Sequence, residues 1–585
     1  MTSKDNHKTQ RLVILQSSLD CQIYLDSHGE LNDLILPIGP EALYFADINQ
    51  LRQTSIRELC INNDYEDNRL KHSKSLGIII NKLNVFSNSN KESPGLDLGN
   101  YFAFQLWVIL GQISYNFTIC QFIKKEYPLS NLLIFRVKNS GNFLKFRPDP
   151  KNILTNVIEN SALFKDNLKV IPYLGKSRTS SIKEYILNII PLGILDFLRF
   201  IRDGSKSFNF NFLGQKKRLL LIGGGYDWYK VMKKPEIKKF FSFKIFRIFP
   251  VLKKKGNIHQ ADIKNILDEE MFGDHHVFYD FTELSIQISK YYLYFMRLHD
   301  GLKKKIASYK GAVSSVLTFP EEVFLAHLVA KNNLPLFVWQ HGEKGQAYDE
   351  TILFTELLYA SDYLMYADQV GKEYIEYLGT NYLDSLHPVG SIGKIIESEK
   401  RQDQVILYAT GKWFHTATPY NDDADPDRRL YKAHRDILAY LNNSQEEVVF
   451  KANNTRGMNT IPYQNEYENI QFEFESPFTE ILKKSKLVIL DSPATTLIES
   501  CSTEVPIFVL SGRCYYRADF LETIKERVVW CEDTNELLKK VDLYLKEGHY
   551  DAKLYDKSYL EKYILPPHIN NVPATILTIL NNKII

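Results

Sequence analysis

The sequence predicts an α/β protein with two Rossmann-like parallel-sheet domains that face a cleft, preceded by an elaborated N-terminal region. From residue 313 onward, short β-branched runs alternate with helical stretches, which is typical of parallel βαβ units. The alternation pauses at a polar stretch, residues 391–404, and then restarts. The chain has 585 residues, which is enough for two large α/β domains.

Composition excludes several classes of protein. The 72 Lys and Arg residues nearly balance the 70 Asp and Glu residues, which argues against a dedicated nucleic-acid binder. A hydrophobic content of 44% with 24% charged residues is typical of a globular chain rather than a disordered one. The 6 cysteines form no C-x-x-C pair, so we expect neither a disulfide scaffold nor a zinc ribbon. This cysteine usage fits a protein of the reducing cytoplasm.

Two apolar segments bear on targeting. The run at residues 12–15 is too short for the core of a signal peptide. Residues 101–119 come nearest to a membrane span, but they contain Gln and Asn side chains. We therefore expect a buried helix there rather than a lipid-spanning one.

The first part of the chain is assigned to an N-terminal domain, residues 1–395, within which residues 1–200 are a candidate separate subdomain. Strands are expected at residues 12–16, 132–137 and 218–222, and a long helix at residues 183–202.

The last part of this domain is read as alternating strands and helices. Further strands are expected at residues 313–317, 334–339, 363–366 and 386–389. Between the first two of them, Thr318 is the predicted cap of a helix, with Pro320 near its first position and Glu321 completing a capping box.

The second domain is predicted to cover residues 396–585. Its expected strands are residues 405–409, 447–451, 487–490, 505–509 and 528–531. Its expected helices are residues 429–441, 477–483, 493–501 and 534–545. Ligands of two such sheets bind by default at the carboxyl ends of the strands.

The strongest candidate site is the segment that follows the strand at residues 487–490. Pro493 suits the first helical position and makes Ser492 the N-cap, so that free N–H groups would point at a phosphate. Thr495 and Thr496 add hydroxyl donors. Glu499 lies one turn further, roughly 6 Å along the axis, where a carboxylate could accept from ribose hydroxyls. The alternative is an ordinary capped helix with a surface glutamate.

Two further turns lie on the same predicted edge. Gly411 and Lys412 follow a strand and would let a phosphate approach the backbone beside a cation. Lys451 and Arg456 lie at and after the next strand and could neutralise a diphosphate. The alternatives are a plain βα turn and a solvated loop.

The opposite wall carries candidate bases. His341 follows a predicted buried strand, Gly342 permits a tight turn, and Glu343 comes next. A histidine suits general-base work near neutral pH, although it could also simply order the loop. Asp227 follows the glycine-rich turn at residues 223–225, a weak signal for which a structural role is favoured.

One surface segment is strongly basic. Residues 233–255 contain nine Lys or Arg residues, five interleaved phenylalanines and Glu236 as the only acid. Such a segment can lie on an anionic bilayer, and it can equally be a charged helix pair over a Phe-lined core. RNA is disfavoured.

Four short motifs together resemble the GT-B glycosyltransferases of bacterial surface-polysaccharide assembly, and more distantly the CDP-glycerol glycerophosphotransferases. They are Gln-His-Gly at residues 340–342, Pro-Val-Gly-Ser at 388–391, Ile-Leu-Tyr-Ala at 406–409 and Asp-Ser-Pro-Ala-Thr-Thr-Leu-Ile-Glu at 491–499. Such families often carry Lys-x-His-Pro after the second strand of the C-terminal domain, whereas this chain reads Lys-Ala-Asn-Asn at residues 451–454.

The resemblance implies a glycosyltransferase that needs neither metal nor cofactor and uses a nucleotide-sugar as substrate. The implied catalytic residues are His341, Glu343 and Asp227. The implied donor-binding residues are Gly411, Lys412, Lys451, Arg456, Ser492, Thr495, Thr496 and Glu499. A surface-glycan or lipid-linked acceptor is implied, at the inner face of the cytoplasmic membrane and without nucleic acid. The alternatives are a CDP-polyol phosphotransferase, a non-catalytic glycan-assembly protein and a sugar-nucleotide epimerase.

Overall fold

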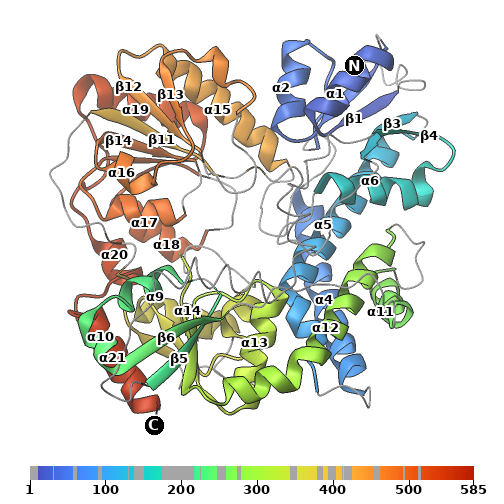
Figure 1. Ribbon diagram of the computed structural model, residues 1–585. Helices are drawn as coiled ribbons and strands as arrows, with labels where there is room; N and C mark the ends of the chain where they lie inside the picture. The colour runs from blue at the N-terminus through green and yellow to red at the C-terminus, as the bar shows by residue number, and fades with distance from the viewer. Residues whose placement is uncertain are drawn as a thin grey trace.

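The computed structural model contains three parallel sheets (Figure 1). It describes residues 11–584 apart from residues 31, 57–61, 90–94, 129–130, 138–149, 174–216, 224, 247–258, 273–278, 343–351, 379–385, 393–394, 396–403, 412, 414–424, 453–460, 492–493 and 512–515. The helix expected at residues 183–202 lies outside the described residues.

The N-terminal sheet has four strands in the order β2-β1-β3-β4. They are β1 (Leu12–Leu15), β2 (Leu34–Pro37), β3 (Leu132–Val137) and β4 (Leu168–Tyr173). Its connecting helices are α1 (Ser18–Ser27), α2 (Pro40–Ile48) and α6 (Pro150–Asn160). The sheet shares no strand with the others, and it has its own apolar cluster around Val13, Leu15 and Leu133.

The middle sheet has six strands in the order β10-β9-β8-β7-β5-β6. They are β5 (Lys217–Ile222), β6 (Phe241–Phe246), β7 (Gly311–Ser314), β8 (Leu336–Trp339), β9 (Asp362–Met365) and β10 (Leu386–Pro388). The helices between them are α9 (Tyr226–Val231), α10 (Pro235–Phe240), α11 (Gln260–Phe272), α12 (Thr282–Ile306), α13 (Pro320–Lys331) and α14 (Asp368–Leu378), with a π-helical turn η3 (Leu353–Leu357).

The C-terminal sheet has six strands in the order β13-β12-β11-β14-β15-β16. They are β11 (Val405–Ala409), β12 (Glu447–Lys451), β13 (Ile470–Glu473), β14 (Ser485–Leu490), β15 (Ile507–Leu510) and β16 (Val529–Cys531). Its helices are α15 (Pro426–Asn442), α16 (Phe478–Leu482), α17 (Thr495–Cys501), α18 (Ala518–Ile524) and α19 (Thr534–Glu547). Every pairing in both six-stranded sheets is parallel, which confirms the prediction of two separate parallel α/β sheets.

The end of the chain ties the C-terminal sheet back to the middle sheet. Helices α20 (Ser558–Tyr563) and α21 (Val572–Lys583) follow the last strand and lie beside α10 and α14 (Figure 1). Gly390, at the junction between the two sheets, packs so closely on this segment that an added Cβ would come within 2.7 Å of Leu565. The junction therefore leaves no room for a side chain.

The N-terminal sheet contacts the C-terminal sheet through α2 and α15. Leu43 of α2 belongs to the apolar cluster of the C-terminal sheet, and the Tyr44 ring meets the Tyr463 ring at 6.0 Å. Arg428 of α15 donates to the carbonyl of Thr54 at 3.0 Å. The N-terminal sheet is therefore attached to the C-terminal sheet by both apolar and polar contacts.

Two long helices link the N-terminal and middle sheets. They are α4 (Asn62–Ser89) and α5 (Leu98–Glu126), which pack on each other. Of the described helices, α5 alone is long and apolar enough to cross a membrane, but 78% of its most apolar window is buried inside the protein. This burial agrees with the core helix expected at residues 101–119.

Several element boundaries differ from the prediction. The strand expected at residues 313–317 ends at Ser314, and the cap of the following helix is Phe319. Glu322, not Glu321, closes that cap, because its carboxylate accepts the N–H groups of Thr318 and Phe319 at 3.0 and 3.1 Å. A short helix and an edge strand, α10 and β6, replace the helix pair considered for the basic segment.

Candidate functional site

The turn after β8 and the start of α17 face each other. These are the two places where the sequence predicts acceptor-side and donor-side chemistry. Gly342 has a φ of +74°, and a Cβ added to it would lie 3.9 Å from Oγ1 of Thr495. The carboxyl ends of the middle and C-terminal sheets thus meet at these two predicted site segments, as the switch-point rule for parallel sheets anticipates.

The His341 turn is held by its backbone, and its side chain is exposed. The His341 N–H donates to Oε2 of Glu356 at 3.2 Å, and the Glu356 side chain is buried. Gln340, also buried, donates from Nε2 to the Gly342 carbonyl at 3.1 Å and accepts from the Tyr366 N–H at 2.8 Å. The imidazole of His341 is exposed, and the next residue, Gly342, faces the start of α17.

The Gly411 turn at the end of β11 is held in a similar way. The Gly411 N–H donates to Oδ1 of Asp491 at 2.9 Å, and the Tyr408 hydroxyl donates to Oδ2 at 2.8 Å. Asp491 is 2% exposed and begins the predicted donor segment. Its carboxylate therefore shapes the turn and is not directed at a ligand.

A buried histidine completes this donor-side cluster. His434 of α15 is 0% exposed, and its Nε2 lies 3.2 Å from Asp491 and 2.7 Å from the Thr410 hydroxyl. Its Nδ1 lies 2.5 Å from the Tyr463 hydroxyl, whose pKa burial raises well above the usual value. A protonated Tyr463 can donate to Nδ1, which leaves Nε2 to donate to Asp491.

Asp227 forms a third arrangement of this kind, at the segment that leads from the middle sheet to the C-terminal sheet. It is 3% exposed, and it accepts from the Tyr366 hydroxyl at 2.9 Å, from the Ser391 hydroxyl at 3.1 Å and from the Ile392 N–H at 3.2 Å. These contacts describe a carboxylate that fixes the junction. A role for Asp227 as a base stays a prediction.

These three buried carboxylates share one pattern, which we call the tyrosine–carboxylate clasp: one carboxylate accepts both a tyrosine hydroxyl and a backbone N–H of a loop. The clasps are Glu356 with Tyr363 and the His341 amide, Asp491 with Tyr408 and the Gly411 amide, and Asp227 with Tyr366 and the Ile392 amide. Asp20 and Asp33 of the N-terminal part show the same pattern, away from the candidate site. Because bonds to a buried carboxylate are strong, each clasp fixes its loop.

The other predicted donor residues are placed as follows. Helix α17 begins at Thr495 with Ala494 as its cap, two residues later than predicted, because Ala494 is not helical (φ −142°, ψ −144°). Thr495, Thr496 and Glu499 are half-buried. Glu499 is still one turn beyond Thr495, on the segment that faces the His341 turn.

Lys451 is engaged at the end of its own sheet. Its Nζ donates to the carbonyls of Ala452 and Phe474 at 3.1 and 2.9 Å, beyond the carboxyl ends of β12 and β13. Burial lowers the pKa of Lys451, while Glu473 and Glu475 act in the opposite direction. A role in binding phosphate stays a prediction.

Four predicted site residues lie outside the described residues: Glu343, Lys412, Arg456 and Ser492. Within the part of the chain that the structure describes, no three His, Cys, Asp or Glu side chains are grouped to hold a metal ion. Metal independence stays a prediction.

The sequence prediction missed Glu356, the carboxylate of one clasp, and His434, which contacts the carboxylate of another. Glu356 is a charge inside the apolar run at residues 352–358, and His434 lies on the apolar face of α15 with Leu430, Ile437 and Leu441. A polar residue in an apolar stripe was the available signal, since buried polar groups are found where partners satisfy them.

No family model and no curated protein sequence matches the chain. Its layout is similar to solved GT-B-type structures at low identity. A UDP-GlcNAc 2-epimerase from Neisseria meningitidis, bound to UDP-GlcNAc, is 11% identical, with a TM-score of 0.37 over 63% of this chain and 100% of that one. The lipopolysaccharide outer core galactosyltransferase WaaB is 14% identical (TM-score 0.34, 63% and 100% covered), and Acinetobacter baumannii MurG is 10% identical (TM-score 0.32, 63% and 100% covered).

These solved structures are of the GT-B-like kind that the sequence motifs indicate. Both transferases and epimerases are among them. A fold does not by itself determine an activity. The choice depends on the site.

Proposed function

We propose that this protein transfers a sugar from a nucleotide-sugar donor to an acceptor hydroxyl between the middle and C-terminal sheets. The observation that supports it is the meeting of the exposed His341 turn with the Thr495 end of α17, each on its own parallel sheet. The donor nucleotide binds on the C-terminal side, along Thr495, Thr496 and Glu499. His341 takes the proton of the acceptor hydroxyl as the glycosidic bond breaks.

The two sides of the site have different chemistry, which favours transfer over a purely structural role. The donor side offers hydroxyls and a half-buried carboxylate, suited to a ribose, and its turn is rigidly held by Asp491. The acceptor side offers an exposed imidazole, the only side-chain type that changes charge near neutral pH without perturbation. A base on one wall and a nucleotide on the other is the arrangement that group transfer needs.

A ligand screen followed by turnover tests this proposal. UDP-, GDP-, CDP- and dTDP-linked sugars and CDP-polyols are compared in thermal unfolding, where a ligand at 100 times its Kd stabilises by about 2.7 kcal/mol. Stabilisation by a nucleotide-sugar and release of its nucleotide only with an acceptor support transfer. Consumption of a CDP-polyol points to the phosphotransferase, sugar epimerisation without acceptor to the epimerase, and no nucleotide binding to a non-catalytic protein.

The finer features of the proposal are a surface-glycan or lipid-linked acceptor, no metal or cofactor requirement, and a cytoplasmic protein peripheral to the inner face of the membrane. Support for the membrane comes from the described part of the basic segment. Lys238, Lys239 and Lys244 are exposed there, and Phe240 and Ile245 are 42% and 43% exposed. Arg218 and Lys305 lie close enough to help burial lower the pKa of Lys244, which marks a concentration of positive charge.

Vesicle flotation tests this membrane surface. We expect binding to anionic vesicles at low salt that is largely lost at high salt and on replacing Lys238, Lys239 and Lys244 with Glu, since each basic side chain contributes about 1 kcal/mol. The matched control replaces the exposed Lys484, Lys525 and Lys557 of the C-terminal part with Glu, the same change of charge. Equal losses in both variants, or no binding by the wild type, contradict the proposal.

A further inference from the structure

We propose that Glu356 is a positioning residue for His341, and that residues 352–359, here called the strap, deliver its carboxylate to the His341 turn. The inference rests on the proposed function in one respect, namely that His341 takes the proton of the acceptor hydroxyl. The strap lies between β8 and β9, and nothing in the sequence motifs indicates a role for it.

The strap contacts the His341 turn through Glu356. Glu356 lies in the π-helical turn η3 and is 1% exposed. Its Oε2 accepts the His341 N–H at 3.2 Å and the Tyr363 hydroxyl at 2.6 Å. π-Helical turns are rare and are frequent at functional sites, so this one is consistent with a local role beyond packing.

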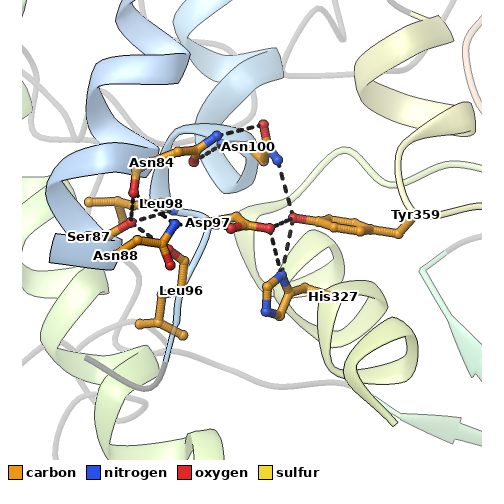
Figure 2. Close-up of polar contacts among 9 residues, drawn as sticks. All are labelled: Asn84, Ser87, Asn88, Leu96, Asp97, Leu98, Asn100, His327 and Tyr359. Atoms are coloured by element: carbon orange, nitrogen blue, oxygen red, sulfur yellow. Dashed lines mark hydrogen bonds and ion pairs between the residues drawn. The ribbon is translucent and has the colours of Figure 1, made fainter. Parts of the chain in front are cut away.

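The far end of the strap is anchored by a polar cluster shown in Figure 2. The Tyr359 hydroxyl donates to Oδ2 of Asp97 at 2.7 Å, and Nδ1 of His327 lies 3.0 Å from the same oxygen. Asn100 donates to the Tyr359 oxygen at 3.3 Å. Tyr359 has a φ of +63°, a left-handed conformation that a tyrosine adopts only when its surroundings hold it there.

The anchor is itself fixed to the α4–α5 helix pair. Ser87 of α4 donates to the Leu96 carbonyl at 2.5 Å and accepts the Leu98 N–H at 3.3 Å, and Asn84 pairs with Asn100 at 3.1 Å (Figure 2). Asp97 lies between these contacts. The strap thus ends at Asp97, the N-cap residue of α5, beside side chains of α4.

A third contact holds the strap directly before Glu356. The Thr355 carbonyl accepts the Leu317 N–H at 2.7 Å, one residue before Glu356. With the strap attached at Thr355 and Tyr359, the Glu356 carboxylate has a defined position. The His341 amide that it accepts is placed accordingly, and with it the direction of the exposed imidazole.

The experiment uses the full chain with three substitutions. Glu356→Ala removes the acceptor, Glu356→Gln keeps an acceptor oxygen without the charge, and Tyr363→Phe removes the other bond to Glu356 and leaves the His341 bond. Thermal unfolding reports stability. The His341 ring is titrated by NMR with ¹³C-labelled histidine, assigned with His341→Gln, and needs no substrate. Turnover uses the nucleotide-linked compound that stabilises the wild type most.

We expect Glu356→Ala to change the His341 titration and to lower kcat roughly tenfold to hundredfold with donor KM little changed, the cost of a misplaced group. Glu356→Gln restores most of kcat while lowering the pKa of the His341 ring, because a nearby negative charge is lost. Tyr363→Phe keeps the carboxylate that accepts the His341 N–H, so at comparable destabilisation its titration and kcat change less than those of Glu356→Ala.

An unchanged His341 titration in Glu356→Ala overturns the proposal. So does a loss of kcat in Tyr363→Phe equal to that in Glu356→Ala at equal destabilisation, since both then reflect stability. If the wild type consumes none of the compounds, the proposed function fails, and the titration alone still decides the role of Glu356.

Discussion

The His341 turn on the middle sheet and the Gly411 turn on the C-terminal sheet are built with the same clasp but place a histidine differently. In both, a buried carboxylate accepts a tyrosine hydroxyl and the backbone N–H of the turn. On the middle sheet the histidine belongs to the turn and its ring is exposed. On the C-terminal sheet His434 is 0% exposed and lies inside the clasp.

On this difference we base the proposal of different roles for two residues of one type. A histidine with both ring nitrogens beside protein partners, as in His434, is committed to holding Asp491, Thr410 and Tyr463 in place. The ring of His341 is exposed at the protein surface, while its backbone N–H is bound to the buried Glu356 carboxylate. The surroundings of a histidine, and not its residue type, decide whether a structural or a catalytic role is proposed for it.

The largest expected effect comes from replacing each of the two histidines, His341 and His434, with glutamine. If His341 is the base, His341→Gln lowers kcat by about 10²–10⁴-fold, the usual contribution of a general base. Its unfolding temperature stays near that of the wild type because the ring is exposed.

His434→Gln is the counterpart, and we expect the reverse order of effects. Its stability falls by about 1–3 kcal/mol, since buried polar partners lose their bonds. Turnover measured well below its unfolding temperature falls less than in His341→Gln. Equal behaviour of the two variants in both measurements would remove the distinction drawn between the two turns.

The next expected effect comes from removing the carboxylate of the C-terminal clasp. Asp491→Ala leaves the Gly411 N–H, the Tyr408 hydroxyl and His434 without their shared acceptor, and we expect a loss of about 3 kcal/mol in the free energy of unfolding. Urea denaturation measures it. The matched control Glu547→Ala removes an exposed carboxylate of the same domain and leaves stability nearly unchanged.

Donor binding provides the next test of the two-sided site. Glu499→Ala should weaken binding of the nucleotide donor by about 1.5–3 kcal/mol, the range for a hydrogen bond to a charged group. Calorimetry with the donor found in the screen measures it, and unfolding temperature controls for folding. An unchanged donor affinity in a folded variant takes Glu499 out of the site and leaves Asp491 as support for the helix alone.

The sequence predicted the C-terminal sheet better than the N-terminal part. The strand at residues 405–409 and the strand at 447–451 are observed with the same bounds, because buried central strands are continuous apolar runs. Strands β2, β4, β6 and β13 were not predicted. β2 is only four residues long, and the pattern of β6 is broken by Lys244 at the edge of its sheet.

The candidate site was predicted only for residues beside strand ends. His341 and Thr495 could be found because local rules connect a strand end, a glycine turn and a helix start. Glu356 reaches His341 across 15 residues and Asp491 reaches Gly411 across 80. Such pairings depend on tertiary packing, which one sequence does not display.

The smallest expected effect is a loss of folding stability at low pH, which Asp97 causes on the side of the His341 turn. Burial raises the pKa of Asp97, but the hydrogen bonds from His327 and Tyr359 outweigh it and hold the pKa at about 2, below the usual 3.8. A depressed pKa stabilises the folded protein above the unfolded value, and this contribution is lost as pH falls from about 4 to about 2. After allowance for solvent, it amounts to about 1–2 kcal/mol. Urea denaturation of the wild type and Asp97→Asn at pH 5 and pH 2.5 measures it: the variant is less stable at pH 5, and the difference shrinks at pH 2.5.

Because Asp97 anchors the strap, the His341 ring resonance should change in Asp97→Asn while resonances of the Gly411 turn stay in place. A stability difference that is the same at both pH values would show that the Asp97 carboxylate does not titrate with the anchor, and the coupling of α5 to the His341 turn would then depend on packing alone.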